Sequence, residues 1–318
     1  MHTNNKNCKS VSIAYTTVMS RRGWVLFAIM TVLWGIPYLL MRVAVRQLDP
    51  GVLVLGRTGP AALVLAPLVL GRGYGKRIRA HLGWIVAFGA SEFGIPWYLM
   101  ATAERHITSS LTSLLVCAVP LFSVVAQRIR RTEERVTTRR LVGLGVGALG
   151  VALLVGLSIQ GGSLKWIALM LVVCVGYTLG PIILATKLQG VPGVAVVATA
   201  TGLVALAWIP WSITHWPTHI DAQTGWSMAA LALLCTAGAF VVFYELVATI
   251  GSTRSVVVTY ANTALAVVLG IAFLREPLTL GIILGFPLVL VGSFVATSGA
   301  NRSLDAVLTR DANISVNQ

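Results

Sequence analysis

The sequence contains few charged residues: they make up 11% of its 318 positions, and only 10 residues are Asp or Glu. Soluble domains carry roughly 25% charged residues. Hydrophobic residues account for 56% of the chain, and the mean hydropathy is +0.83. A soluble globular fold could not cover so much apolar surface, so the composition excludes that class and indicates an integral membrane protein.

Cysteine is scarce too, and catalytic motifs are lacking. The 4 cysteines are scattered, without a CxxC pair or metal-ligand spacing, which indicates packing residues and argues against disulfides or a metal site. No HExxH or GxSxG motif is present. Gly145 to Gly150 spell GxGxxG, but within an apolar stretch that no strand precedes, so we predict no nucleotide site. We expect neither an enzyme nor a cofactor.

Long apolar runs recur along the chain with short breaks. A helix crosses the roughly 30 Å hydrocarbon layer with about 20 such residues. The runs lack the alternation of barrel strands, so we expect helices. The predicted fold is an all-α integral membrane protein with ten transmembrane helices. They cover Trp24–Arg46, Val52–Leu70, Leu82–Ala103, Leu111–Arg128, Leu141–Ser158, Lys165–Lys187, Gly193–Ile213, Trp226–Ile250, Ser255–Leu274 and Leu278–Ser298.

Basic residues predict the orientation of these helices. The net charge of +14 is spread between the apolar runs and not along one face, so we predict no nucleic-acid partner. Lys and Arg gather at the N-terminus and in the second and fourth loops, whereas the long loop 215–223 has none. We therefore expect a multi-pass protein of the cell's inner or plasma membrane with both termini cytoplasmic. Residues 1–23 are a predicted leader and residues 300–318 a disordered tail; Met19 is an alternative start, which leaves residues 1–18 open.

The second half of the chain repeats features of the first. Residues 24–160 and 165–299 are predicted to form two repeats of five helices each. An odd number of helices makes the second repeat enter the membrane from the opposite side, so the repeats are inverted, a common design of secondary transporters. The pairs that match at a shift of 142 residues are Leu141 and Ile283, Gly143 and Gly285, Gly150 and Gly292, Glu134 and Glu276, and Thr137 and Thr279.

Several short stretches carry a family resemblance. They are Trp34-Gly35, Ser109 to Leu121, Ile250 to Arg254 and the segment Leu274-Arg275-Glu276-Pro277-Leu278-Thr279. With these, the chain from Trp24 to Ser298 resembles the EamA family of the drug/metabolite transporter superfamily. The resemblance implies ten helices in two repeats and export of amino acids, other metabolites or drugs. Two stretches depart from the pattern: Arg131 to Arg135 replaces a Gly-Glu-Pro turn, and Asn262-Thr263 stands where proline is common, which leaves the cargo open.

Glu92 is the first candidate for a functional residue. It lies ten residues into the third predicted span, near the bilayer centre at about 1.5 Å per residue. Pro96 cannot donate to the Glu92 carbonyl, so a free acceptor should lie beside the carboxylate, a combination that suits a proton or an ammonium group. Burial favours the neutral acid, which would let Glu92 exchange a proton for substrate. Arg57, offset by roughly 7 Å along the membrane normal, offers the alternative of a structural ion pair.

Other candidates share a position inside the predicted spans. Arg57 either holds a substrate carboxylate or neutralises Glu92. The aromatic candidates either line a cavity or pack between helices, and a polar patch in the ninth span is predicted to form a binding wall. Glu245 is either a gate residue near Arg254 or an interfacial acid. The substrate- or proton-binding candidates are Glu92, Arg57, Trp34, Tyr38, Trp97, Tyr98, Tyr260, Asn262 and Thr263.

These features predict a secondary transporter, with a proton-coupled exporter of amino acids or related small metabolites as the leading hypothesis. A multidrug exporter of lipophilic cations is one alternative, and a lipid scramblase, which needs a polar groove open to lipid, is another. The predicted partners are a small-molecule substrate, protons and the lipid bilayer. Gly143-x3-Gly147 and Gly281-x3-Gly285 predict close packing of the last helix of each repeat, within one chain or across a homodimer.

Overall fold

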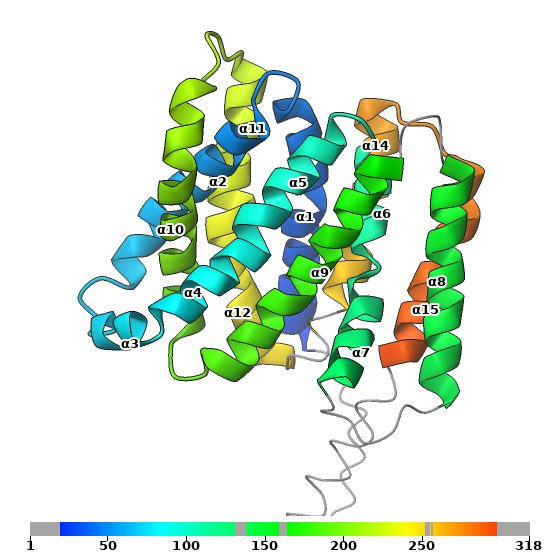
Figure 1. The fold of residues 1–318 in the computed structure, drawn as a ribbon, viewed down its shortest axis with the longest axis horizontal. Helices are drawn as coiled ribbons and strands as arrows, with labels where there is room; N and C mark the ends of the chain where they lie inside the picture. The colour runs from blue at the N-terminus through cyan, green and yellow to red at the C-terminus, as the bar shows by residue number, and fades with distance from the viewer. Residues whose placement is uncertain (1–19, 131–137, 159–163, 252–254, 256, 298–318) are drawn as a thin grey trace, which may run out of the picture.

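The computed structural model describes residues 20–130, 138–158, 164–251, 255 and 257–297. All regular structure in this part of the chain is helical (Figure 1). The helices are α1 Arg21–Ala44, α2 Pro50–Leu65, η1 Ala66–Leu68, α3 Gly75–Ala80, α4 Leu82–Gly89, η2 Ala90–Gly94, α5 Ile95–Glu104, α6 Ser109–Val116, α7 Val119–Ile129, α8 Thr138–Ser158, α9 Leu164–Lys187, α10 Gly193–Thr214, α11 Ala222–Ala232, η3 Leu233–Gly238, α12 Ala239–Ile250, α14 Val258–Leu274 and α15 Leu280–Thr297.

Most of these helices have the length and apolarity that a membrane requires. Six stretches of the described chain are long and apolar enough to cross a membrane: Arg21–Ala44, Pro50–Leu68, Ser109–Ile129, Leu164–Lys187, Gly193–Thr214 and Ala222–Ile250. Shorter apolar helices cover Leu141–Leu157, Val258–Leu274 and Leu280–Val295. Large hydrophobic side chains lie exposed on the outer surfaces of the bundle, as a lipid-facing surface requires. The chain is an all-helical, multi-pass membrane protein.

The predicted spans agree with the observed helices to within a few residues, with two kinds of exception. The fourth predicted span, Leu111–Arg128, is not one helix, because α6 ends at Val116 and α7 begins at Val119. Pro120 explains the break, since proline fits only the first turn of a helix. The third and eighth spans each contain a π-helical segment, η2 and η3. Residues 1–19, 131–137, 159–163, 252–254, 256 and 298–318 lie outside the described residues, and with them Met19, Glu134, Thr137, Arg254 and most of the predicted leader and tail.

Consecutive long helices run in alternate directions through the bundle (Figure 1). We call one end, with the connections 45–49, 105–108, 215–221 and 275–279, the upper end. The lower end contains the start of α1, the short helix α3 and the end of α12. At the upper end Gln47 Nε2 donates to Asp221 Oδ2 at 2.6 Å, and Trp211 Nε1 donates to Asp49 Oδ1 at 2.8 Å. These bonds join the α1–α2 connection to the α10–α11 connection.

The contacts between the two halves of the chain come in matching sets. Helix α1 packs against α11, α12 and α14 of the second half, and α9 packs against α4, α5, α6 and α7 of the first. Helix α2 packs against α10, and α8 packs against α15. The first helix of each half, α1 or α9, thus packs against the third and fourth passes of the other half. Two halves with equivalent packing roles are what an internal repeat produces.

Glycines let α8 and α15 approach closely. A Cβ on Gly150 would lie 2.6 Å from the Val289 nitrogen, and one on Gly285 would lie 2.7 Å from the Gly150 oxygen. Gly292 rests in the same way on the backbone of Gly147. A side chain at any of these contacts would push the two helices apart. The predicted close packing of the last helix of each half therefore forms within one chain.

Candidate functional site

A π-helical segment places Glu92 inside the bundle. In η2 the Ile95 N–H donates to the Ala90 carbonyl five residues earlier, and Pro96 follows in the first turn of α5. Proline supplies no N–H to the preceding turn, so the α-helical ladder cannot continue unchanged through this point. A single π turn absorbs the mismatch, and such turns are frequent at functional sites.

The Glu92 carboxyl group lies against α9. Its Oε2 atom is buried and has no hydrogen-bond partner. The side chain contacts Gly180, where any Cβ would collide with Oε2, and Gly176 faces the Ser91 carbonyl and the Pro96 ring. These two glycines make room for the irregular segment. A buried carboxyl oxygen without a donor is costly as an anion, so the pocket favours a bound proton or cation.

Arg57 of α2 is buried beside the second π-helical segment. Its side chain is only 5% exposed. The Nε atom donates to Thr236 Oγ1 at 2.9 Å, and Nη1 donates to Met41 Sδ at 3.6 Å. Thr236 belongs to η3, where its hydroxyl also donates to the Leu231 carbonyl five residues earlier. The π-helical segment η2 therefore carries the buried acid Glu92, and η3 carries Thr236, a hydrogen-bond partner of the buried Arg57.

The guanidinium of Arg57 contacts an aromatic ring and no acidic side chain of the described residues. Its Cζ lies 3.5 Å from the centroid of the Trp97 ring, a cation–π contact. No carboxylate oxygen of the described residues lies within 4.0 Å of the Arg57 nitrogens. The ion pair among the described residues joins Arg22 to Glu245. The structure thus contains no Arg57–Glu92 ion pair. A buried guanidinium with neutral partners keeps donors available for an anionic group of a ligand.

Aromatic rings extend from Arg57 across the bundle. Phe93 lies 5.0 Å from Trp97 and 5.5 Å from Phe240 between ring centroids, and Trp34 lies 6.1 Å from Phe240. We call Trp97, Phe93, Phe240 and Trp34 the aromatic row. Trp97 also donates from Nε1 to the Tyr177 hydroxyl of α9 at 3.1 Å. The row connects α5, η2, α12 and α1, so it links the two halves of the chain.

The remaining candidates fall into two places. Tyr38 is buried near Met41 and Tyr177, in the apolar cluster beside Arg57. Tyr98 points elsewhere and stacks on Trp208 of α10, with centroids 4.7 Å apart. These positions separate Tyr98 from Trp97, its neighbour in sequence.

The polar patch of α14 lies largely inside the bundle. Asn262 and Thr263 are buried, and the Thr263 hydroxyl donates to the Thr259 carbonyl at 2.9 Å. Here α14 lies close to α1, because a Cβ on Gly35 would be 3.0 Å from the Asn262 carbonyl. Tyr260 packs with the apolar cluster that contains Val289 of α15. Thr263 interacts with Cys117 of that same cluster, so Tyr260 and Thr263 have a common neighbour.

Glu276 closes the upper end between the two halves. Its carboxylate, 8% exposed, accepts hydrogen bonds from the backbone nitrogens and hydroxyls of Ser109 and Ser110, at 2.5 to 3.0 Å. These donors are the first residues of α6, so the acid satisfies free N–H groups and complements the positive end of the helix dipole. Gly270 leaves space for the carboxylate. The segment that carries the sequence resemblance therefore anchors α6.

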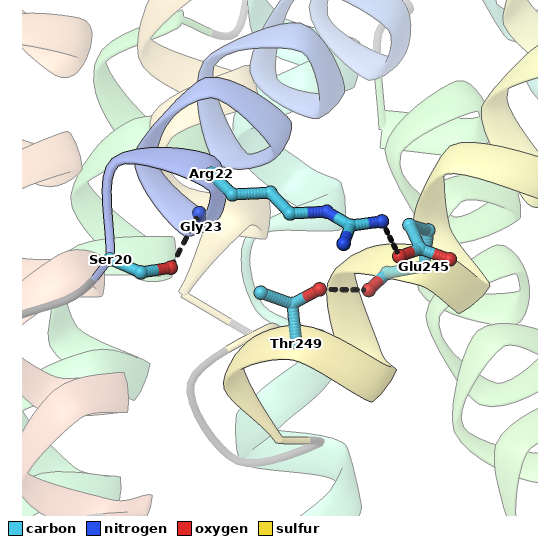
Figure 2. A network of polar contacts seen from close by, with 5 residues as sticks. All are labelled: Ser20, Arg22, Gly23, Glu245 and Thr249. Atoms are coloured by element: carbon cyan, nitrogen blue, oxygen red, sulfur yellow. Dashed lines mark hydrogen bonds and ion pairs between the residues drawn. The ribbon is translucent and has the colours of Figure 1, made fainter.

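Glu245 lies at the lower end, where it forms an ion pair with Arg22 of α1 (Figure 2). The two side chains are 46% and 69% exposed, respectively. In the same network Ser20 caps α1 through the Gly23 N–H, and Thr249 donates to the Glu245 carbonyl. Exposed pairs of this kind contribute only about 0 to 1 kcal/mol. Glu245 thus joins α1 to α12 near the membrane surface and lies outside the Arg57 and Glu92 surroundings.

The sequence profile of the EamA-like transporter family matches residues 21–156 and again residues 164–298. The chain belongs to the EamA-like transporter family. This EamA-like transporter is also 24% identical over 280 residues to an uncharacterized transporter of Archaeoglobus fulgidus, covering 86% of this chain and 98% of that protein. A solved structure, titled only as the crystal structure of a protein, shares the fold with a TM-score of 0.62 at 17% identity, covering 88% of this chain and 98% of that chain.

Sequence reasoning missed one acid of this EamA-like transporter. Glu104 is the last residue of α5, and its side chain is fully buried. The third predicted span ends at Ala103, one residue before this acid. The helical spacing contained the signal, since Trp97, Met100, Ala101 and Glu104 recur every three or four residues and all are buried. Thr236 and Tyr177 were missed because a single hydroxyl in an apolar span has no distinguishing pattern.

Proposed function

We propose that this EamA-like transporter is a proton-coupled exporter of amino acids or related small metabolites. The observation that carries the proposal is the Glu92 carboxyl group, whose buried Oε2 atom has no partner and lies against Gly180 in the middle of a π-interrupted span. Such a group binds a proton when the site is closed and releases it when a cationic group or water arrives. Exchange of the two would couple cargo movement to the proton gradient.

Arg57 supports a cargo with a carboxylate. Its guanidinium is buried over Trp97 and bonded to neutral acceptors, so an incoming carboxylate would be its first anionic partner among the described residues. Guanidinium and carboxylate match in geometry, and burial strengthens the contact. An amino acid offers both a carboxylate for Arg57 and an ammonium group for an acid.

A multidrug exporter of lipophilic cations is the second candidate. The aromatic row favours it, because ring faces attract cations and fit apolar cargo. Arg57 opposes it, since its positive charge lies on the same row and would repel a cationic drug. A lipid scramblase has less support. The groove of about 580 Å³ between α1, α11 and the end of α14 is lined mainly by apolar side chains such as Leu39, Trp226 and Phe273.

The proposed organisation is ten transmembrane helices in two inverted five-helix repeats, with both termini on the cytoplasmic side of the cell membrane. The matching contact sets and the π-helical segments in corresponding spans support the repeat. Basic residues support the orientation, because α3 and its surroundings at the lower end carry Arg72, Lys76, Arg77 and Arg79.

Efflux from proteoliposomes tests the proposal. Amino acids and a cationic dye are loaded, and their release is followed with and without a pH gradient for the wild type and Glu92→Gln. We expect Glu92→Gln to lose gradient-driven release of amino acids while the protein stays folded. Glu245→Gln is the matched control, because it removes an exposed acid at the lower end and should leave coupling intact. Gradient-driven release that survives in Glu92→Gln would show that Glu92 is not the coupling group.

A further inference from the structure

A second buried acid lies in the same pass as Glu92, at the upper end. Glu104 ends α5 and is 0% exposed, and both of its carboxyl oxygens are buried without a hydrogen-bond partner. Glu276, at the same end of the bundle, accepts hydrogen bonds from Ser109 and Ser110 on both oxygens. One buried acid is therefore built to be an anion, and the other has none of the donors that an anion requires.

The cations around Glu104 are bonded to neutral acceptors. Arg105, the next residue, donates from Nη2 to the Leu48 carbonyl at 2.7 Å. Arg42 of α1 donates from Nη1 to the Ile107 carbonyl at 3.4 Å, and Arg57 of α2 bonds to Thr236. None of these guanidinium groups lies within 4.0 Å of the Glu104 carboxyl group. The acid is thus not one half of a structural ion pair.

The chain on either side of this acid belongs to a buried apolar cluster, which includes Met100, Ala101, Ile107 and Leu111. The charged and titratable groups that act on it electrostatically are Arg42 and Tyr38 of α1, Arg57 of α2 and Glu276 after α14. The two arginines favour an anion and Glu276 opposes it. Removal of a carboxylate from water without hydrogen bonds costs more than such distant attraction returns.

We propose that Glu104 is a second proton-binding site of this transporter, neutral and protonated in the conformation described here. It lies twelve residues after Glu92 in one continuous pass, which places the two acids roughly 18 Å apart at about 1.5 Å per residue. A proton that enters from the upper end meets Glu104 before it can reach Glu92. Loss of that proton creates an anion that needs new donors, and Arg42 and Arg105 can supply them only if their side chains move toward it, which would strain their bonds to the Ile107 and Leu48 carbonyls. Deprotonation would therefore loosen the contacts of the upper end.

Infrared pH titration of the purified protein in lipid tests this inference without any transport assay. A neutral carboxyl group has a C=O absorption that an ionised one lacks. We expect Glu104→Gln to remove a component of this absorption at neutral pH, and Glu92→Gln to leave that component in place. A spectrum in which Glu104→Gln removes only carboxylate absorption would overturn the proposal.

A stability measurement gives a second, independent readout. A neutral acid without hydrogen bonds can be replaced by leucine of similar volume, so Glu104→Leu should unfold at the same temperature as the wild type or higher. An ionised Glu104 predicts the opposite, because its removal would take a counter-charge from the buried Arg57, and a lower unfolding temperature would refute the site. Both readouts are separate from the efflux assay of Glu92→Gln. The proposed function can therefore fail while the Glu104 site stands, and the reverse also holds.

Discussion

At the scale of single residues, the two buried charges that sequence reasoning paired, Glu92 and Arg57, belong to different surroundings. Glu92 lies against the glycines of α9, whereas Arg57 lies over Trp97 and bonds to η3. A rise per residue fixes height in the membrane but not the direction around the helix axis, which packing decides. The separation is consistent with the separate ligands proposed for them, a proton at Glu92 and an anion at Arg57.

Substitution of Arg57 tests the anion site. Arg57→Lys keeps the positive charge but loses the planar contact with Trp97 and the bond to Thr236. We expect the KM for a carboxylate-bearing cargo to rise about tenfold, equivalent to roughly 1.4 kcal/mol, and Arg57→Gln to raise it further. Concentration-dependent efflux measures both, and Arg46→Lys, at an exposed position of the upper end, serves as the control.

Efflux of a cationic dye by the same variants tests the multidrug alternative. If the natural cargo is a lipophilic cation, Arg57→Gln should speed its efflux, because the repelling charge is gone while the aromatic row remains. An unchanged KM for carboxylates together with faster dye efflux would support the multidrug alternative. The sign of the change therefore separates the two candidate functions.

The sequence indicates a candidate site residue where a charged residue interrupts an apolar run. It does not do so where the charged residue lies at the end of the run. Glu92 and Arg57 are the sole charged residues of their predicted spans, so the sequence indicates both as candidates. Glu104 is followed by Arg105 and His106, which is typical of a loop, yet α5 continues for one more residue and turns the acid inward. Which side of that last helical turn is buried depends on how α5 packs against its neighbours, and the sequence does not show that packing.

At the scale of helices, the apolar runs predicted positions well and irregularities poorly. Span boundaries follow hydropathy because lipid permits little else than a helix. Pro96 predicts a break in the helical hydrogen bonding next to Glu92, and the structure has the π-helical segment η2 at this position. Segment η3 has no proline, so nothing in residues 233–238 predicted it. A π turn depends on how the pass fits its neighbours, here on Thr236 meeting Arg57, and that contact joins residues 179 positions apart.

The α8–α15 pair allows a matched test of helix packing. A Cβ on Gly150 would come within 2.6 Å of the backbone of α15, whereas one on Gly145 of the same helix meets nothing within 4 Å. We expect Gly150→Ala to lower stability by about 1 to 3 kcal/mol, because backbone atoms cannot yield as a side chain can. Gly145→Ala should be neutral or stabilising by up to about 1 kcal/mol, since alanine is the better helix former.

Thermal unfolding in detergent measures both variants side by side. Equal unfolding temperatures for Gly150→Ala and Gly145→Ala would show that α8 and α15 do not pack through these glycines. The comparison also bears on the homodimer that the glycine motifs left open. A loss of stability that is independent of protein concentration locates the contact within one chain, as the structure has it.

At the scale of the whole molecule, function depends on which face of the membrane each end of the bundle occupies. The helices alternate in direction, and the lower end carries the start of α1 and the basic helix α3 (Figure 1). By the positive-inside rule, the proposed orientation has the lower end in the cytoplasm and the upper end, with Glu104 and Glu276, outside. An exporter driven by the proton gradient takes up protons from outside, so this orientation puts Glu104 on the side where protons enter.

Single introduced cysteines can test that orientation once Cys8 is replaced by serine, because the native Cys117, Cys174 and Cys235 are buried. We expect His219→Cys, in the α10–α11 connection, to react with a membrane-impermeant maleimide added to intact cells. Arg72→Cys, in the α2–α3 connection, should react only after the membrane is permeabilised. The reverse pattern would place the upper end in the cytoplasm. Glu104 would then bind protons on the side where they leave, and the exporter would have to be reconsidered as an importer that uses the same two acids in the opposite order.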